Sequence, residues 1–284
     1  MDVSYISIIL FIITTVVYFT VPSIGKIPLT LSDLANPDKS LENYSTNLTR
    51  LGLYFLTVVV VQFLLNVSYL IGKCGGSIGK NVGASALFTF IPWVFIFGIM
   101  IATLIIYPGF KSAFSDVIGY FAVAGSANAI LSAILVDPDV SKIVDTSTTL
   151  TSKEKSDMRQ SAEAIMKICG NKSILINQMT PDNFLNIWDT MKPLMREQGN
   201  IPDIDLSKQK LFDLVVLKDN IGEGMWYVYS AILISSIVYY NLATRGCIKD
   251  INQIKSDHDA YIEEQEQVDK KAELNNSTVY NMGT

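Results

Sequence analysis

Four long apolar runs constrain this chain more than any other feature of its sequence. None of them contains Asp, Glu, Lys, Arg or His; they cover residues 3–21, 51–71, 84–106 and 225–242. A helix rises about 1.5 Å per residue, so a run of about 20 residues crosses the hydrocarbon core of a bilayer. We therefore predict a mostly α-helical, polytopic integral membrane protein whose four transmembrane helices lie at residues 1–23, 51–71, 84–106 and 224–243. Pro92 predicts a kink within the third of them.

The composition agrees with this prediction. Hydrophobic residues make up 49% of the chain and charged residues only 17%, whereas soluble domains carry about 25% charged residues. The first run could instead be a cleaved signal peptide. However, Asp2 stands where a signal peptide carries Lys or Arg, and the run is longer than the usual 7–15 apolar residues or so. An uncleaved first span is therefore the favoured interpretation.

The remaining segments are predicted to lie outside the membrane. They are an extramembrane loop at 24–50, a glycine-rich turn at 72–83, a helical insert at 107–223 and an acidic C-terminal tail at 244–284. In the insert, apolar side chains recur at helical spacing at Phe184, Leu185, Trp188, Met191 and Met195, and residues 206–217 form a further candidate helix. Such stripes are typical of a small hydrophobic core.

Residues 117–136 are uncharged and form a possible fifth span. Their Gly, Ser and Asn residues dilute a modest apolar content, since each Leu, Ile, Val or Phe favours insertion by only about 0.3–0.6 kcal/mol. With four spans, Lys73, Lys80, Arg245 and Lys249 share one side, as the positive-inside rule prefers. We therefore favour four spans, with both termini on the cytoplasmic side. The segment would then be a buried helix of the insert or a helix lying on the membrane, although five spans remain possible.

The sequence offers little material for catalysis or metal binding. Its three cysteines, Cys74, Cys169 and Cys247, show no CxxC spacing and predict no disulfide framework, and His258 is its one histidine. Acidic side chains near predicted helix ends are explained by capping and solvation: Asp203, Asp205, Asp213, Asp219 and Glu223. No catalytic motif and no basic run is present, so we predict no enzymatic activity, no cofactor, no metal and no nucleic-acid partner.

Two groups of residues in the spans are candidate sites. Aromatic side chains at the ends of the last span suggest the belts found at membrane–water interfaces: Trp226, Tyr227, Tyr229, Tyr239 and Tyr240. Gln62 and Asn66 share one helix face at i,i+4 spacing. They are predicted to make interhelical hydrogen bonds, or alternatively to line a transport pathway.

The tail carries a candidate docking stripe. Residues at alternating spacings of three and four form one face of a predicted helix: Ile251, Ile254, His258, Tyr261, Gln265, Val268 and Ala272. Ile251, Ile254, Tyr261 and Val268 are its apolar members, and the surrounding residues are mostly acidic. The pattern predicts docking on a partner or on the helical insert, with a solvated amphipathic tail as the alternative.

Two stretches resemble a known group of proteins. "LVVLKDNIGEGMWYVYSAILISSIVYYNLATRGC", at residues 214–247, and "PGFKSAFSDVIGYF", at residues 108–121, are similar to segments of membrane proteins from large icosahedral double-stranded DNA viruses of algae and protists. The resemblance implies a structural protein of the internal virion membrane that links the bilayer to capsid or minor capsid proteins. A second copy of the chain is a further possible partner. A channel or transporter with a pathway near Gln62 and Asn66 is the alternative, and a host-membrane assembly factor is a third.

Overall fold

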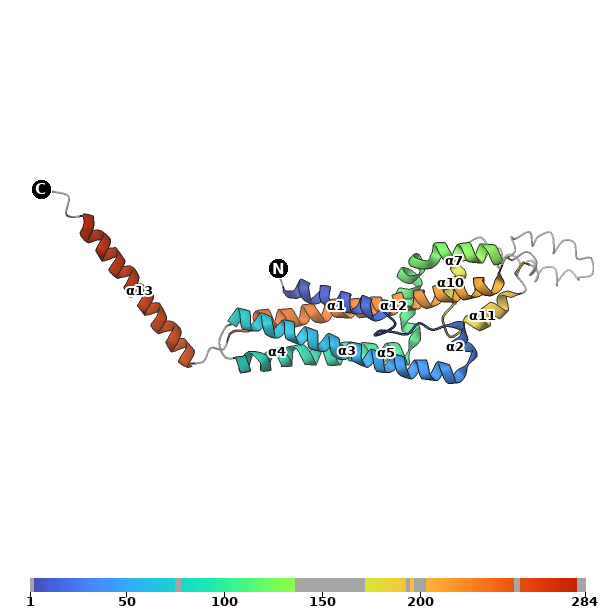
Figure 1. Ribbon diagram of the computed structural model, residues 1–284, viewed down its shortest axis with the longest axis horizontal. Helices are drawn as coiled ribbons and strands as arrows, with labels where there is room; N and C mark the ends of the chain where they lie inside the picture. The colour runs from blue at the N-terminus through green and yellow to red at the C-terminus, as the bar shows by residue number, and fades with distance from the viewer. Residues whose placement is uncertain are drawn as a thin grey trace, which may run out of the picture.

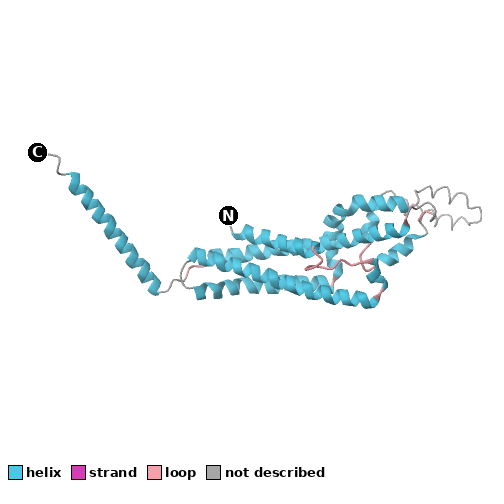
Figure 2. Ribbon diagram, viewed as in Figure 1, coloured by secondary structure: helices cyan, strands magenta, loops and turns pink. Residues whose placement is uncertain are grey.

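The computed structural model describes residues 3–74, 78–135, 172–192, 195–196, 203–247 and 251–279, and these residues are almost entirely helical (Figure 2). Their one β-type pairing is an isolated antiparallel bridge between Leu135 and Met195. The longer helices are α1 (Val3–Thr20), α3 (Pro37–Cys74), α4 (Ile78–Pro92), α7 (Tyr120–Ile134), α12 (Ile204–Thr244) and α13 (Ile251–Val279). Short helices complete the fold: α2 (Leu31–Ala35), α5 (Gly98–Ile106), α6 (Ser112–Phe114), α10 (Leu175–Gln178) and α11 (Phe184–Met191).

Four helical segments lie side by side in a bundle (Figure 1). They are α1, α3, the continuous α4–α5 segment and the C-terminal half of α12, which confirms the mostly α-helical membrane class. Their shared core is aromatic at its centre, where Phe11, Trp93, Phe97 and Tyr227 are almost fully buried. A π-helical turn, η1 (Trp93–Phe97), joins α4 to α5 directly after Pro92. The missing proline N–H explains this irregularity, as the sequence predicted a kink there.

Two of the bundle helices extend far beyond a membrane. At about 1.5 Å per residue, the 38 residues of α3 and the 41 residues of α12 measure about 57 and 60 Å, roughly twice the thickness of a hydrocarbon core. Both extensions leave the bundle at the same end (Figure 1). Each helix is therefore long enough to cross a bilayer with one part and to extend beyond it with the other.

A second core surrounds the N-terminal half of α12. Its buried residues come from α7, α10, α11 and α12 and include Leu131, Ile176, Phe184, Trp188 and Phe212. The predicted apolar stripe of the insert is thus confirmed as part of a core: Phe184, Leu185, Trp188 and Met191 belong to α11, and Met195 packs against the same core after α11 ends.

The candidate fifth span packs in this second core rather than in the bundle. Val123, Ala127 and Leu131 of α7 are at most 1% exposed and contact the insert helices. By length and composition, the segment Pro108–Ile134 is nevertheless one of four that could cross a membrane, with Asp38–Cys74, Asn81–Ile106 and Ile204–Thr244, while Tyr5–Thr20 is a shorter apolar helix. The packing agrees with a helix of the insert, and the number of spans stays a prediction.

The segment that leads into α7 crosses α12 at very short range. It contains η2 (Pro108–Lys111) and the π-helical η3 (Ser115–Gly119). A Cβ atom on Gly222 of α12 would lie 2.6 Å from the Ser115 Cβ, and one on Gly119 would lie 2.6 Å from the Lys218 carbonyl oxygen. Only glycine fits at these two positions, so the two backbones touch and fix the second core on the end of the bundle.

Helix α13 projects away from the bundle end opposite the second core (Figure 1). Its side chains are exposed at residues 254–256 and 258–272, while the side chain of Ile251 lies outside the described part of the structure. Of the predicted stripe, Ile254, Tyr261 and Val268 are 52%, 58% and 55% exposed. These apolar side chains have no cover within the described part of the chain.

Candidate functional site

A cluster of buried charges lies where the two cores meet. The Glu223 carboxylate is 2.9 Å from the Nζ atoms of both Lys26 and Lys111, and its side chain is only 8% exposed. Lys111 also pairs with Asp219 at 3.0 Å. Lys26 donates a further hydrogen bond to Asn220 Oδ1 at 2.8 Å. Four charges from three distant parts of the chain therefore neutralise one another.

The aromatic core of the bundle continues from this cluster. The Tyr227 hydroxyl donates to Glu223 Oε1 at 2.7 Å, and the Tyr227 ring stacks on Tyr54 with centroids 5.8 Å apart. Charged side chains can be buried this far only when each of them has partners. Here Glu223 uses both carboxylate oxygens, one toward the lysines and one toward the tyrosine.

These contacts correct two sequence-based interpretations. Asp219 and Glu223 lie in the middle of α12, not near a solvated helix end, whereas Asp203 does cap α12 by accepting from the Leu206 N–H. Tyr227 is 1% exposed and faces the bundle interior, so its assignment to an interfacial belt is wrong. The cause is that Glu223, Tyr227, Ala231 and Ile234 occupy one buried face of α12.

The other belt residues do lie near the surface. Tyr229 and Tyr240 are 50% and 68% exposed. The Trp226 Nε1 atom donates to the Phe110 carbonyl oxygen at 2.8 Å, and Tyr239 packs against Tyr69. Their positions at the two ends of the last span are those that an interfacial belt requires.

A second ion pair holds the crossing between η3 and α12. Lys218 is 2% exposed and its Nζ atom is 2.7 Å from Asp116 Oδ1. Along residues 106–121, six apolar side chains are exposed, and we refer to them together as the exposed stripe: Ile106, Tyr107, Phe110, Val117, Ile118 and Phe121. Directly after the third span ends, this part of the chain thus pairs a buried charge with the protein and presents apolar side chains to its surroundings.

A cavity of about 470 Å³ adjoins the charge cluster. Its lining includes side chains at the ends of the spans, among them Leu51, Leu104 and Ile105, and polar side chains beyond them, such as Asn43 and Thr180. Lys26, Lys111, Asp219 and Glu223 also contribute to the wall. The volume is in the range of about 300–1,000 Å³ that small-molecule sites occupy.

Gln62 and Asn66 make the interhelical hydrogen bonds that the sequence predicted. Gln62 is 1% exposed; its Nε2 atom donates to the Ser7 carbonyl oxygen at 3.0 Å, and Ser7 Oγ donates back to its Oε1 atom. Asn66 Nδ2 donates to Thr89 Oγ1 at 2.9 Å. A small polar space beside them has room for about one water molecule. The two amides therefore join α3 to α1 and to α4.

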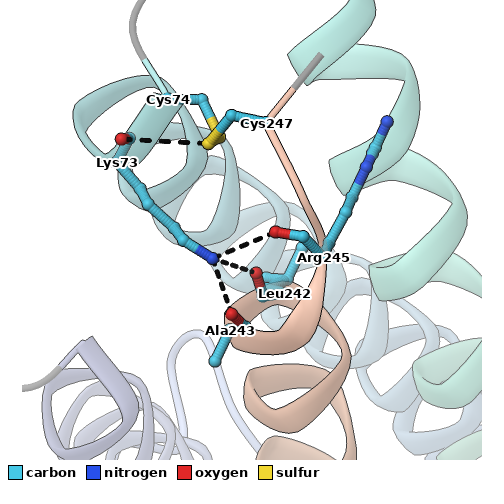
Figure 3. Close-up of a disulfide and its surroundings, with 6 residues drawn as sticks. All are labelled: Lys73, Cys74, Leu242, Ala243, Arg245 and Cys247. Carbon is cyan, nitrogen blue, oxygen red and sulfur yellow. Dashed lines mark hydrogen bonds between the residues drawn. A yellow bond between two sulfur atoms is a disulfide. The ribbon is translucent and has the colours of Figure 1, made fainter.

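The opposite end of the bundle contains a disulfide that the sequence analysis did not predict. Cys74, the last residue of α3, is bonded to Cys247, with Cα atoms 5.2 Å apart (Figure 3). The Lys73 ammonium donates to the carbonyl oxygens of Leu242, Ala243 and Arg245 at 3.1, 2.6 and 3.2 Å (Figure 3). It satisfies carbonyl groups that the end of α12 leaves without helical partners. Cys169 lies outside the described residues.

Neither the comparisons nor the described side chains point to a known chemistry. No protein-family model, curated protein or solved structure matches the chain. No group of three or more His, Cys, Asp and Glu side chains is placed to hold a metal within the part of the chain that the structure describes. The junction is thus described by its own features alone: a buried charge cluster beside a cavity with a polar and an apolar part.

Proposed function

We propose that this chain is a non-enzymatic membrane anchor that holds a structural partner protein at a bilayer. The observation that carries the proposal is the exposed apolar face of α13, where Ile254, Tyr261 and Val268 are each more than half exposed. A helix with such a face has a strong tendency to bury it in a groove of another protein. Residues 249–284 hold four Lys against eight Asp or Glu, so the partner groove should be apolar with a basic rim.

The attachment of α13 supports an anchoring role. The disulfide and the Lys73 hydrogen bonds fix the end of α12 to the end of α3 directly before the start of α13. A pull on the tail is thus transmitted to two helices of the bundle instead of one. At the other end, the second core provides a further surface on rigid extensions of α3 and α12.

The identity of the partner follows from the resemblance of residues 108–121 and 214–247 to viral membrane proteins. On that basis the bilayer is the internal membrane of a large DNA virus, with host membranes used during assembly, and the partner is a capsid or minor capsid protein. In purified particles, a lysine-reactive cross-linker and mass spectrometry should join Lys255 or Lys270 of α13 to a capsid protein. Absence of the chain from particles would exclude this role.

A pair of variants tests the docking face itself. Ile254→Asp with Tyr261→Asp should abolish these cross-links, because two charges would enter the apolar face. Ser256→Asp, on the opposite face of α13, adds a charge of the same sign and should leave them intact. Equal cross-linking in both variants would contradict the use of this face.

The channel alternative has weaker support. A pathway along Gln62 and Asn66 requires side chains that are free to meet a solute, yet both amides are hydrogen-bonded between helices. Ion or solute flux through liposomes that contain the purified chain, lost in Gln62→Leu, would favour the channel over the anchor.

A further inference from the structure

The junction cavity lies where the apolar spans end and the second core begins, which is the level at which we expect a bilayer to change from acyl chains to headgroups. Leu51, Leu104 and Ile105 of its lining belong to apolar spans, whereas Asn43 and Thr180 lie beyond them. Trp226 and the exposed stripe around Phe110 mark the same level. A single cavity that crosses this boundary suits a molecule with an apolar part and a polar part.

The rim of the cavity includes apolar side chains that face outward. Tyr44 and Leu48 of α3 are 56% and 47% exposed, and Ile105 at the end of α5 is 37% exposed. These residues continue the outer, lipid-facing surface of the spans. An amphiphile can therefore enter sideways from the membrane, keeping its acyl chain against the bundle.

The charges of the lining select the headgroup. Among the described residues, the lining has two lysines, Lys26 and Lys111, against four carboxylates: Asp116, Asp182, Asp219 and Glu223. Lys26 and Lys111 are already neutralised by Glu223 and Asp219, and Lys218 neutralises Asp116. Asp182 is exposed and has no ion-pair partner among the described residues, so the excess charge is negative. An anionic headgroup would be repelled, and an amine would be attracted.

We propose that the junction cavity binds a zwitterionic phospholipid of the surrounding bilayer. Its acyl chain lies along Leu51, Leu104 and Ile105, and its headgroup amine is attracted by the carboxylate of Asp182. A bound lipid would fill the space between the bundle and the second core and couple the two.

The test measures lipids retained by the purified full-length chain. The protein is exchanged from detergent into an equimolar mixture of 1-palmitoyl-2-oleoyl phosphatidylethanolamine and the matching phosphatidylglycerol, and bound lipid is counted by native mass spectrometry. We expect phosphatidylethanolamine to be retained over phosphatidylglycerol by roughly fivefold or more, from one charge–charge difference near a protein surface. Equal retention, or a preference for phosphatidylglycerol, would overturn the proposal.

Two matched pairs of variants locate the site. Leu48→Trp should block the rim and lower retention severalfold. Leu64→Trp is the control, because Leu64 is also an exposed leucine of α3, at 56% against 47% for Leu48, but lies outside the cavity. Asp182→Asn should remove the preference for the amine, while Asp189→Asn removes a carboxylate that does not line the cavity. The assignment would be refuted if Leu64→Trp or Asp189→Asn changed the bound lipid in the way expected of its partner variant. It would also be refuted if none of the four substitutions changed the amount or the type of lipid retained. Neither result depends on whether α13 docks a partner.

Discussion

Substituting Gly222 by alanine tests how the second core is held on the bundle. The new Cβ would lie 2.6 Å from Ser115 Cβ, 2.8 Å from the Ser115 backbone nitrogen and 2.9 Å from the Lys111 carbonyl oxygen. Non-bonded carbon atoms normally approach to about 3.5–4.0 Å. Because two of the three contacts are with backbone, a side-chain rotation cannot relieve them, and η3 must move away from α12 by about 1 Å.

The magnitude follows from comparison with a second glycine. Overpacking of this kind costs about 1–3 kcal/mol, while alanine in a helix interior is favoured over glycine by up to about 1 kcal/mol. Gly125 of α7 has nothing within 4 Å of the point that an alanine methyl would occupy, so Gly125→Ala gains the helix preference without a clash. The difference between the two variants isolates the steric cost. We expect Gly222→Ala to be less stable than Gly125→Ala by about 1–3 kcal/mol, a factor of about 5 to 150 in the folded population.

Reversible unfolding in mixed detergent micelles, followed by circular dichroism, measures this difference. Hydrogen exchange supplies a local readout: amides of η3 and the middle of α12 should exchange faster in Gly222→Ala, while those of α1 should not. Gly119→Ala should behave in the same way, because its Cβ would lie 2.6 Å from the Lys218 carbonyl oxygen. Equal stability of Gly222→Ala and Gly125→Ala would refute the close crossing.

Three further changes test the charges and the disulfide. Glu223→Gln leaves Lys26 and Lys111 with too few counter-charges and should lower the free energy of unfolding by about 3–5 kcal/mol in the same assay. The control Asp189→Asn breaks a pair with Lys192 whose side chains are 63% exposed, and its effect should be much smaller because water screens that pair. Equal effects of the two variants would contradict the buried cluster. Cys247→Ser removes a disulfide between residues 173 positions apart and should lower the free energy of unfolding by up to about 5 kcal/mol. Cys169→Ser is the control, because it leaves this disulfide intact. If a reductant does not change the stability of the wild type, the disulfide is contradicted. Hydrogen bonds from Thr30 lower the pKa of Asp33 in the folded chain. The stabilisation of α2 by Asp33 is therefore complete above the unfolded pKa of about 3.9 and is lost as the pH falls through the lower folded pKa. Hydrogen exchange of the α2 amides should show this loss, and Asp33→Asn should make the exchange independent of pH in this range.

The spans could be predicted from sequence because their signal is local. A run without charges needs no partner to be recognised, and the i,i+4 spacing of Gln62 and Asn66 is visible within one helix. The interfacial position predicted for Tyr227 is wrong because proximity to a span end does not show which face of the helix a side chain occupies. Tyr227 lies four residues from both Glu223 and Ala231, and the burial of all three on one face becomes apparent only in the folded bundle.

The charge cluster and the disulfide could not be predicted in the same way. Glu223 meets Lys26 only after the chain has folded, across 197 positions of sequence, and Lys111 comes from a third segment. At the edge of an apolar run, a glutamate has the same local pattern whether it is solvated or buried. The odd number of cysteines likewise concealed a bridge between two helix ends that meet only in the folded bundle.

The disulfide also bears on which side of the membrane the C-terminal tail occupies, a question that the sequence answered from its basic residues. Lys73 donates to three carbonyl oxygens at the end of α12, and the Arg245 guanidinium lies 5.9 Å from the centre of the Phe88 ring. Both cations therefore have structural roles at these positions, which weakens the positive-inside argument for a cytoplasmic tail.

Disulfides persist on the oxidising side of a membrane. We accordingly expect a tag placed after Thr284 to be protected from protease in sealed vesicles whose interior is oxidising, and Cys74 and Cys247 to resist alkylation before reduction. The contradicting result has two parts: the tag is digested from the cytosolic side, and Cys74 and Cys247 are nonetheless bonded within the cell. Together they would show that redox environment does not determine the topology.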